Sequence, residues 1–408
     1  MRRLASLLAA VALASACGTS PGPDPLVPHV ALRLTDSTTG FGLALLDRLL
    51  AEPEAGNVFI SPLSATLMLS MAASAAGGDT RAGMLKTLGL DPTIDPSGQI
   101  RQTIERLAQS DADAQLELAQ AVWVKKSLVL NPAYVTRLRS DYHAQLANLD
   151  FAAPDASKAV NAWVDNATHH KITNLVDGFD PSTVGYLVNA TYFHALWRTE
   201  FDTRAPGDFH SFAGDVKSVP MMKRDENVVV LRTPGYTAAL LPYRGGRFSA
   251  LLILPSDTLS PAGFATFLSD KNWSATLGYL HQATGHSLGG DCAEPNAAIA
   301  PDVALTCRAS LVMPKFRLEY RKDLTDTLVA MGMPMSELPA FCSGCYLDQV
   351  VQKTYLEVDE KGTTAAAATG GAVLSALPMA MVVDHPFAFA LIDNATDAPL
   401  FLGAIGDL

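Results

Sequence analysis

Small, uncharged residues fill one long stretch near the C-terminus. From Gly362 to Met379 the chain holds alanines, threonines and glycines, with no charge and no large side chain before Val373. Such a stretch cannot pack itself into a core, and a structureless segment of this length in a compact domain is usually functional. Small residues also suit a strand that slides between two others, because alternate side chains then meet little resistance. The sequence therefore predicts a long functional loop here.

The rest of the chain has the composition of a large folded protein. Of its 408 residues, 49% are hydrophobic and 17% charged, which supports a sizeable core and excludes an intrinsically disordered chain. No linker or repeat divides the sequence after about residue 35, so a single domain over residues 31–408 is expected. A net charge of −11 without a run of Lys or Arg argues against nucleic acid or an anionic membrane surface as partner. Protein partners stay open, and we expect a monomer.

The first residues indicate export. Two arginines precede the apolar stretch Leu4–Leu13, and small residues then lead to Cys17. The residues before Cys17 resemble a bacterial lipobox, with Ala14 where a leucine is usual. We therefore expect residues 1–17 to be a lipoprotein-type signal, Cys17 to carry a lipid, and the protein to face the periplasm or the cell exterior. An ordinary cleaved signal with an incidental cysteine is the alternative. Residues 18–30 are expected to form a flexible tether, and no other apolar run could span a bilayer.

Four further cysteines suggest disulfide bonds in an exported protein. Cys292 and Cys307 bracket a stretch rich in Pro and Ala, whereas Cys342 and Cys345 form a C-x-x-C motif. This motif also occurs as a redox pair or as half of a zinc site. Zinc lacks a second half, since no other C-x-x-C or paired-histidine motif is present. A thioredoxin-like motif lacks its strand and helix. Two structural disulfides and no metal site are therefore favoured.

Hydrophobic periodicity predicts helices early in the chain and mainly strands later. Helical spacing of apolar residues covers Thr35–Leu50, and Ser61-Pro62 supplies a helix start before the apolar run Ala65–Ala76. Another helix is expected at Ala159–His170. Strands are expected at Leu116–Lys125, Tyr186–Phe193, Thr237–Leu241, Phe248–Leu254, Ser310–Met313 and Phe387–Ile392. This order predicts an α+β chain with large sheets.

One motif points to an enzyme. Residues 285–289 form G-x-S-x-G, the nucleophile elbow of α/β-hydrolases, in which Ser287 would be the nucleophile and His385 the base. The motif requires a buried strand before it and a helix after it. Here the residues before it are mixed in character, and those after it contain a cysteine and two prolines. A surface loop is therefore favoured over a secreted hydrolase.

Several short stretches, each weak alone, stand in a specific order and spacing over nearly all of residues 31–408. They are Asn57–Ser64, Val160–Val164, Leu187–Phe193, Trp197, Val219–Met222, Leu241–Tyr243, Met313–Phe316, Leu356–Thr363, His385–Phe387 and Pro399–Gly403. Together they resemble the serpin family. The resemblance implies an α+β serpin fold with three β-sheets, about nine helices and an exposed reactive loop near residues 360–380.

The resemblance also implies a function. A serine-type peptidase attacks the loop and forms an acyl-enzyme; the cut loop then inserts into the main sheet as a new strand and traps the peptidase. The chain would be an inhibitor and not an enzyme, and no cofactor is expected. A serpin-fold binding protein or chaperone, which never traps an enzyme, is the alternative within the same fold.

By the same resemblance, the hinge of the loop falls at Glu360, Gly362 and Thr363. The side chains expected to face inward on insertion form one alternating, uncharged set. They are Thr363, Ala365, Ala367, Thr369, Gly371 and Val373. Inhibitory members of the family avoid charge and bulk at these positions, so the set supports an inhibitor over a merely flexible loop.

The position of the scissile bond depends on the count. About fourteen residues onward from Gly362, as the family's loop implies, the cut falls after Ala376 and before Leu377. A count back from His385 puts the cut nearer Ser375, and Leu374 is a further alternative. No Lys or Arg follows Lys361. Trypsin-like targets are therefore not expected, whereas elastase-, chymotrypsin- or subtilisin-like peptidases accept such residues.

The resemblance singles out a second group of residues beneath the main sheet. Ser61, Ser64 and Asn189 match positions that form hydrogen bonds where strands must part. Gln352 stands where many members have a histidine; it offers a donor and an acceptor but does not titrate. Trp197 matches a tryptophan near the point where the loop enters, and core packing is its other role. Residues from about 280 to 307 have no counterpart in the family pattern and are expected to be an insertion.

Overall fold

The structure is a computed structural model that describes residues 33–52, 56–109, 113–225, 228–285, 288–289, 292–293, 300–363 and 379–408. Cys17, Ser287 and the loop positions from 364 to 378, which include the expected scissile bond, lie outside the described residues. The predictions for them therefore stay predictions.

Nine helices occur among the described residues. They are α1 (Arg33–Leu50), α2 (Pro62–Ala75), α3 (Gly78–Thr87), α4 (Ser97–Leu107), α5 (Pro132–Ser140), α6 (Ala156–Ala167), α7 (Pro261–Phe267), α8 (Asp270–Thr284) and α9 (Thr325–Ala330). The predicted helices correspond to α1, α2 and α6. None of the helices that the structure describes combines the length and the hydropathy needed to cross a membrane.

Seven strands form the largest sheet, in the order β1-β17-β16-β9-β8-β7-β10, with every neighbouring pair antiparallel. Their bounds are β1 (Val58–Ile60), β7 (Val229–Arg232), β8 (Tyr236–Pro242), β9 (Phe248–Pro255), β10 (Ala304–Thr306), β16 (Phe387–Asp393) and β17 (Ala398–Ile405). All residues of β9, β16 and β17 are buried. Near-continuous apolar runs therefore make this sheet the central wall of the core.

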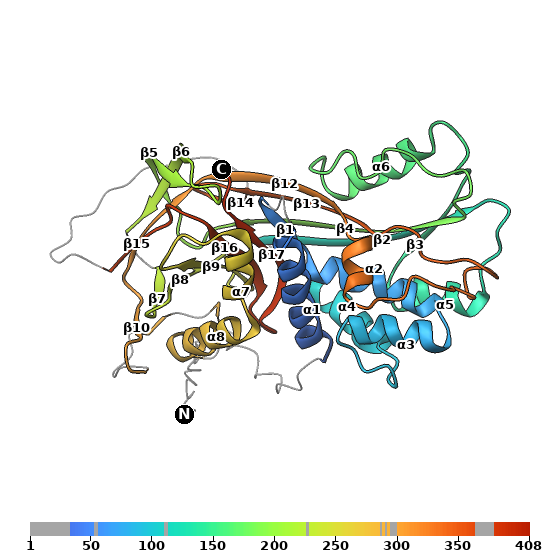
Figure 1. Ribbon diagram of the computed structural model, residues 1–408, viewed down its shortest axis with the longest axis horizontal. Helices are drawn as coiled ribbons and strands as arrows, with labels where there is room; N and C mark the ends of the chain where they lie inside the picture. The colour runs from blue at the N-terminus through green and yellow to red at the C-terminus, as the bar shows by residue number, and fades with distance from the viewer. Residues whose placement is uncertain are drawn as a thin grey trace, which may run out of the picture.

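A second sheet lies at one end of the molecule, at the left of Figure 1. It has the order β15-β11-β6-β5, built from β5 (Asp202–His210), β6 (Val216–Arg224), β11 (Ser310–Pro314) and β15 (Ala380–Val382). The strand β15 follows directly after the loop region and pairs in parallel with β11.

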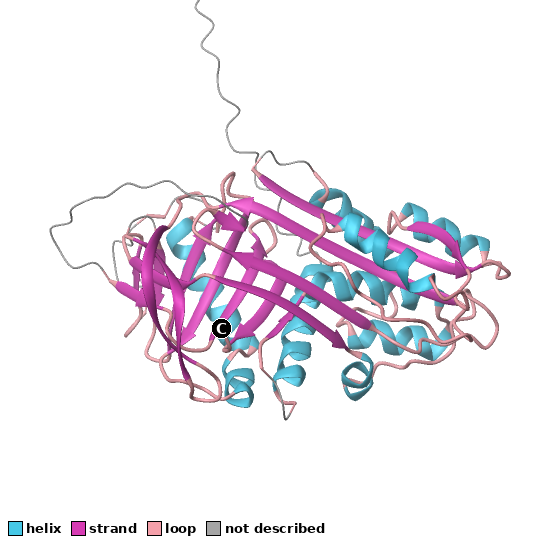
Figure 2. Cartoon of the chain, turned by 90° about the horizontal axis from the view of Figure 1, so that it is seen from above, coloured by secondary structure: helices cyan, strands magenta, loops and turns pink. Residues whose placement is uncertain are grey.

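A long layer of strands runs along the molecule and covers α2 to α5 (Figures 1 and 2). Hydrogen bonds divide this layer into two parts, β14-β4-β2-β3 and β12-β13. The strands are β2 (Ala114–Lys125), β3 (Gln145–Leu149), β4 (Gly185–Leu196), β12 (Phe316–Asp323), β13 (Val351–Val358) and β14 (Gly362–Thr363). The helix α6 lies on the opposite face of the layer from α2 to α5 (Figure 1). The expected three sheets are recovered when the two parts of this layer are counted together.

The helix α2 lies beneath this layer because of its sequence. The Ser61 hydroxyl accepts a hydrogen bond from the Ser64 backbone N–H at 3.2 Å, and Pro62 occupies the first turn, so the helix begins where predicted. Almost every following residue is buried, including Leu67, Leu69 and Met71. A helix that is apolar all round must lie inside the core, and α2 contacts β4 and β17.

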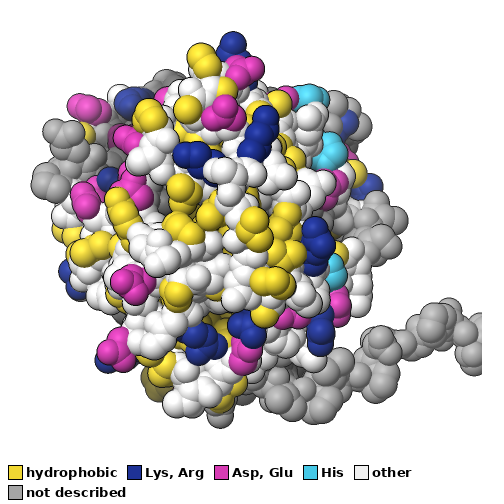
Figure 3. All heavy atoms as spheres, turned by 90° about the vertical axis from the view of Figure 1, so that its right-hand side faces the viewer, with side chains coloured by type: hydrophobic (Ala, Val, Ile, Leu, Met, Phe, Trp, Pro, Cys, Tyr) yellow, Lys and Arg dark blue, Asp and Glu magenta, His cyan; other side chains and the backbone are white. Residues whose placement is uncertain are grey.

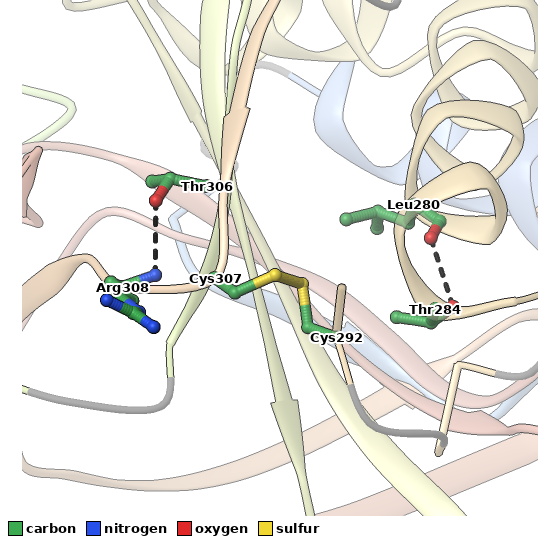
Figure 4. Close-up of a disulfide and its surroundings, with 6 residues drawn as sticks. All are labelled: Leu280, Thr284, Cys292, Thr306, Cys307 and Arg308. Atoms are coloured by element: carbon green, nitrogen blue, oxygen red, sulfur yellow. Dashed lines mark hydrogen bonds between the residues drawn. A yellow bond between two sulfur atoms is a disulfide. The ribbon is translucent and has the colours of Figure 1, made fainter. Parts of the chain in front are cut away.

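The two expected disulfides are present, Cys292–Cys307 and Cys342–Cys345. The first ties Cys292, which follows α8, to Cys307 at the end of β10; Thr306 next to it accepts a hydrogen bond from the Arg308 backbone N–H at 3.1 Å (Figure 4). The Cys292–Cys307 disulfide therefore fastens the chain after α8 to β10, the edge strand of the seven-stranded sheet.

Candidate functional site: the loop hinge and the parted layer

The main feature of the site is the boundary between β4 and β13. The strand β13 pairs with β12, from Val351 opposite Asp323 to Val358 opposite Phe316, and β4 pairs with β2 and, at one end, with β14. No ladder joins β4 to β13 among the described residues. Each strand therefore keeps an edge of backbone N–H and C=O groups that one further strand could pair with.

The chain begins to fill this boundary at one end. After β13 it turns through residues 359–361, and β14 then pairs antiparallel with β4, with Gly362 opposite Leu196 and Thr363 opposite Ala195. A Cβ atom on Gly362 would overlap the backbone oxygen of Ala195, so only glycine allows this approach. The first two residues of the expected reactive loop thus already occupy the place of a central strand.

Hydrogen bonds fix the turn between β13 and β14. The Asp359 carboxylate accepts from the backbone N–H groups of Lys361 and Gly362, at 2.9 and 3.2 Å. The Trp197 backbone N–H donates to the Lys361 carbonyl at 2.7 Å, and the Trp197 indole N–H donates to the Asp359 carbonyl at 2.9 Å. The entry point of the loop is therefore held by the segment that follows β4.

Glu360 is anchored on the outer side of this turn. Its carboxylate accepts from the Thr203 hydroxyl at 2.7 Å and from the Lys315 ammonium at 3.0 Å. Partial burial opposes ionisation, but these two hydrogen bonds prevail and hold the pKa of the Glu360 carboxyl below its usual range. Because the folded-state pKa is depressed, this contact stabilises the hinge at neutral pH and is lost as the pH falls through the acidic range.

Aromatic packing supports the hinge from beneath. Trp197 is fully buried, stacks on Tyr243 with ring centroids 4.3 Å apart, and meets the edge of Phe201 at 5.9 Å. The Trp197 ring thus packs in the core while its two N–H groups hold the turn. The buried Arg224 lies over the Phe201 ring and donates to the Thr199 carbonyl, and burial lowers its pKa to about 9.

Midway along the boundary, Gln352 on β13 joins the start of α2. Its side-chain oxygen accepts from the Ser61 backbone N–H at 3.1 Å, and its amide nitrogen donates to the Ser61 carbonyl at 2.9 Å. The Ser61 hydroxyl donates to the Leu400 carbonyl at 2.7 Å. The Gln352 amide thus donates one hydrogen bond and accepts another, both with the backbone of Ser61. A neutral histidine also has one donor and one acceptor, whereas a protonated histidine has two donors and no acceptor.

Asn189 does not join this network. Its side-chain oxygen accepts from the Thr191 hydroxyl at 3.1 Å, and its amide nitrogen is buried without a hydrogen-bond partner among the described residues. Gln120, opposite Asn189 on β2, likewise has a buried amide nitrogen without a partner there. Ser61, Ser64 and Gln352 therefore form one cluster on the β13 side, while Asn189 stands apart on the β4 side of the boundary.

A cavity of about 960 Å³ lies at the other end of the boundary, where β4 begins and before β13 starts. Met68 and Leu69 of α2 form part of its lining, together with residues 178–187, 321–326 and 341–350. At this end of the molecule apolar side chains gather in the middle of the face, with charged side chains of both signs around them (Figure 3). The boundary is thus closed at the hinge and hollow at the far end.

The residues that hold the hinge were not all foreseen. Thr203, Tyr243 and the carbonyl of Asp359 carry contacts that no spacing in the sequence predicted, because their partners lie far along the chain. Lys315 and Asp359 belong to stretches that carried the family resemblance, which was the available signal. Ala365, Ala367 and Thr369 of the expected hinge set lie outside the described residues, as do Leu374, Ser375, Ala376 and Leu377.

The surroundings of the G-x-S-x-G motif do not fit a nucleophile elbow. The element before the motif is the helix α8, which ends at Gly285 with φ of 65°, where a hydrolase needs a buried strand. His385 is engaged elsewhere, with Asp384 at 2.7 Å and with the Pro255 carbonyl at 2.8 Å. No group of three His, Cys, Asp or Glu side chains that could hold a metal ion occurs within the described part of the chain.

The chain is similar to known proteins over nearly its whole length. Residues 36–408 match the family model described as serpin (serine protease inhibitor). The chain is 31% identical to the leukocyte elastase inhibitor of Sus scrofa over 91% of its own length and 99% of the relative's. It is 31% identical to Iris of Ixodes ricinus, with 92% and 99% coverage.

Solved structures agree with the fold. The crystal structure of Serpin48 from the insect Tenebrio molitor is 26% identical, with a TM-score of 0.74 and coverage of 92% of this chain and 98% of that one. The thermophilic serpin Tengpin, in a structure titled as the native state, is 24% identical, with a TM-score of 0.77 and coverage of 92% and 94%. With the parted layer, the hinge and these matches together, the chain belongs to the serpin family.

Proposed function

We propose that this protein inhibits serine-type endopeptidases as a suicide substrate. The observation that carries the proposal is the partly filled boundary, in which β14 pairs with β4 at the hinge end, where the described residues before the loop end at Thr363. The next residues along the chain, from position 364 onward, are small and uncharged and could continue that strand. The name of the family and the relatives named as elastase inhibitors support the same function.

The mechanism follows from the two open edges. The hydroxyl of the peptidase's catalytic serine attacks a loop carbonyl and forms an acyl-enzyme, and the new amino terminus leaves with β15. The freed loop extends β14 along β4 and β13, and the peptidase, still esterified to the loop, is carried with it. Successive residues of the inserted strand gain ladder hydrogen bonds alternately to β4 and to β13, so ordinary sheet formation, delayed by topology, drives the step.

The loop sequence sets the target class. The residues near the expected scissile bond are Leu374, Ser375, Ala376 and Leu377, and no Lys or Arg lies between Lys361 and the C-terminus. A trypsin-like pocket requires a cation, whereas elastase-, chymotrypsin- and subtilisin-like pockets accept small or apolar side chains. We propose a target of the second kind.

Incubation with an elastase separates the candidate functions. An inhibitor gives a complex that survives detergent, whereas a serpin-fold binding protein or chaperone is simply cut. A hydrolase would act on ester substrates. The helix before Ser287 argues against this last function, and the uncharged hinge set argues for the first.

We also propose that the protein is an exported lipoprotein. The proposal rests on the N-terminal pattern of two arginines, an apolar stretch and small residues before Cys17. A diacyl anchor on Cys17 and the tether of residues 18–30 would hold the inhibitor at the membrane surface as a monomer.

The first prediction concerns insertion. We expect Thr363→Arg to turn the inhibitor into a substrate. Position 363 already pairs with Ala195 of β4, but no ladder joins it to β13 among the described residues. Full insertion would close the layer over an arginine there and enclose its guanidinium beside the buried Ala195. Burying an unpaired charge costs about 3 kcal/mol or more, which slows insertion by roughly a hundredfold and lets the acyl-enzyme hydrolyse first. The measurement is the number of inhibitor molecules consumed per elastase molecule inactivated. Thr363→Val is the matched control and should trap normally; an arginine variant that traps as well as the parent refutes loop insertion.

The second prediction concerns specificity. Ala376→Arg should raise the rate of trypsin inhibition by roughly a hundredfold, because the arginine would enter the cation-binding pocket. Ser375→Arg is the control and should have little effect on that rate. If the control gives the gain and Ala376→Arg does not, the bond lies one residue earlier.

The third prediction concerns the anchor. A Cys17→Ser variant expressed in a bacterial host should move from the membrane fraction to the soluble exported fraction, since no acyl chain can be attached. Ser15→Ala, which keeps the cysteine, should stay in the membrane fraction. Retention of Cys17→Ser in the membranes would contradict a lipid anchor.

A further inference from the structure

A short loop joins the two sides of the boundary at its hollow end. It comprises residues 337–346, between α9 and β13, and we call it the clasp. An isolated bridge between Glu337 and Tyr346 closes its base, and the Leu338 backbone N–H donates to the Cys345 carbonyl at 2.7 Å. The disulfide Cys342–Cys345 closes its tip. The clasp is thus a small, self-contained unit on the wall of the cavity.

The clasp reaches the β4 side through one aromatic ring. Phe341 is buried and packs against Gly185, the first residue of β4, so closely that a Cβ atom there would overlap the ring. The ring also lies 6.2 Å from that of Tyr134 on α5. Gly185 is therefore needed for the fit, and Phe341 holds the end of β4 in place.

Other contacts tie the clasp to the helices and to β13. The Ala340 backbone N–H donates to the Ala75 carbonyl of α2 at 3.0 Å, and the Asn131 backbone N–H donates to the Ala340 carbonyl at 3.1 Å. Toward β13 the chain simply continues: residues 347–350 lead from the clasp into that strand, and the Val350 carbonyl accepts from the Leu324 backbone N–H at 2.7 Å. The clasp thus contacts α2, the start of α5 and the start of β4, and it is joined to β13 through the chain itself.

The Cys342–Cys345 disulfide lies where an external thiolate can reach it. It closes a ring of four residues, which removes less chain entropy from the unfolded state than the ring of sixteen closed by Cys292–Cys307. Cys345 is buried and Cys342 is partly exposed, beside the exposed Ser343 and Gly344, so a thiolate can approach the Cys342 sulfur. The C-x-x-C spacing is also that of pairs that undergo thiol–disulfide exchange.

We propose that Cys342–Cys345 is a site of reversible thiol–disulfide exchange, and that its reduction loosens the clasp and the end of the boundary that the clasp holds. The reductant is a dithiol, small or protein-borne. One of its thiolates attacks Cys342 and expels the Cys345 thiolate; its second thiol then displaces Cys342. The dithiol leaves as a disulfide, and the two cysteines take up its two protons and two electrons.

The consequence for function rests on the proposed inhibition. With the clasp loosened, Phe341 no longer fixes the start of β4, so β4 and β13 part more easily, the uncleaved loop inserts more readily and the protein loses its inhibitory form. In the oxidised protein the clasp keeps the loop from inserting before it is cut. Inhibition therefore depends on an oxidising compartment.

The first test does not depend on inhibition. Amide hydrogen exchange is followed by mass spectrometry at residues 185–187 and 347–351, with and without dithiothreitol. We expect exchange there to rise about fivefold on reduction, a typical coupling between two sites, while residues 250–253 in the seven-stranded sheet stay unchanged. Equal exchange with and without reductant overturns the proposal.

Matched variants assign the effect to one disulfide. Reduction should still act on Cys292→Ser/Cys307→Ser, and it should have no effect on Cys342→Ser/Cys345→Ser, which should exchange rapidly from the start. The opposite pattern overturns the proposal. If the second variant fails to fold, chemical reduction of the first variant, which keeps only the clasp disulfide, decides between the same two outcomes.

The second test measures function. The half-life of elastase-trapping activity at 37 °C should fall about fivefold on reduction, with the chain uncut on a gel. If the oxidised protein traps no peptidase, the proposed inhibition is wrong, and the hydrogen-exchange measurement alone decides whether reduction loosens the clasp. If the oxidised protein traps elastase and reduction changes neither the hydrogen exchange nor the half-life, the proposed redox control is wrong and the inhibition stands.

Discussion

The facing edges of β4 and β13, which no ladder joins among the described residues, are the constraint on which the rest of this structure depends. Sheets normally pair or cover their edges, and here two edges face each other inside a layer that has helices on both sides. The chain itself carries a candidate for a strand between these edges, since β14, at Gly362 and Thr363, leads into the small, uncharged residues of the loop. On the proposed mechanism, the loop adds ladder hydrogen bonds to both edges when it inserts.

Three groups of contacts maintain this arrangement, one at each level of the boundary. Trp197, Asp359 and Glu360 fix the turn at which the loop enters. Gln352 holds β13 to the start of α2, while Asn189 on the other side keeps a buried amide nitrogen without a partner in the described residues. At the far end the clasp closes the layer around a cavity.

Much of the fold could be predicted from the sequence, for identifiable reasons. The helix α2 was predictable because Ser61 and Pro62 give a start signal before an apolar run, and the strands of the central wall because their runs are apolar and β-prone. Gly362 stood out through the family pattern, and the structure adds the close approach to Ala195 as its reason. The division of the long layer, the separation of Asn189 from Gln352, and the wedge of Phe341 on Gly185 could not be predicted. They depend on the spatial register of segments far apart in the chain, which local patterns do not encode.

The central claim is that the protein is metastable and becomes more stable when its cut loop inserts as a strand between β4 and β13. The most direct test is the midpoint of thermal unfolding, measured before and after elastase in catalytic amount cuts the loop once near Ala376. Insertion of about a dozen residues would add roughly twenty ladder hydrogen bonds, about two per residue, at about 1 kcal/mol net each. The account predicts that the midpoint of the cut protein rises by roughly 20 °C. A midpoint that stays the same or falls after a single clean cut would contradict it.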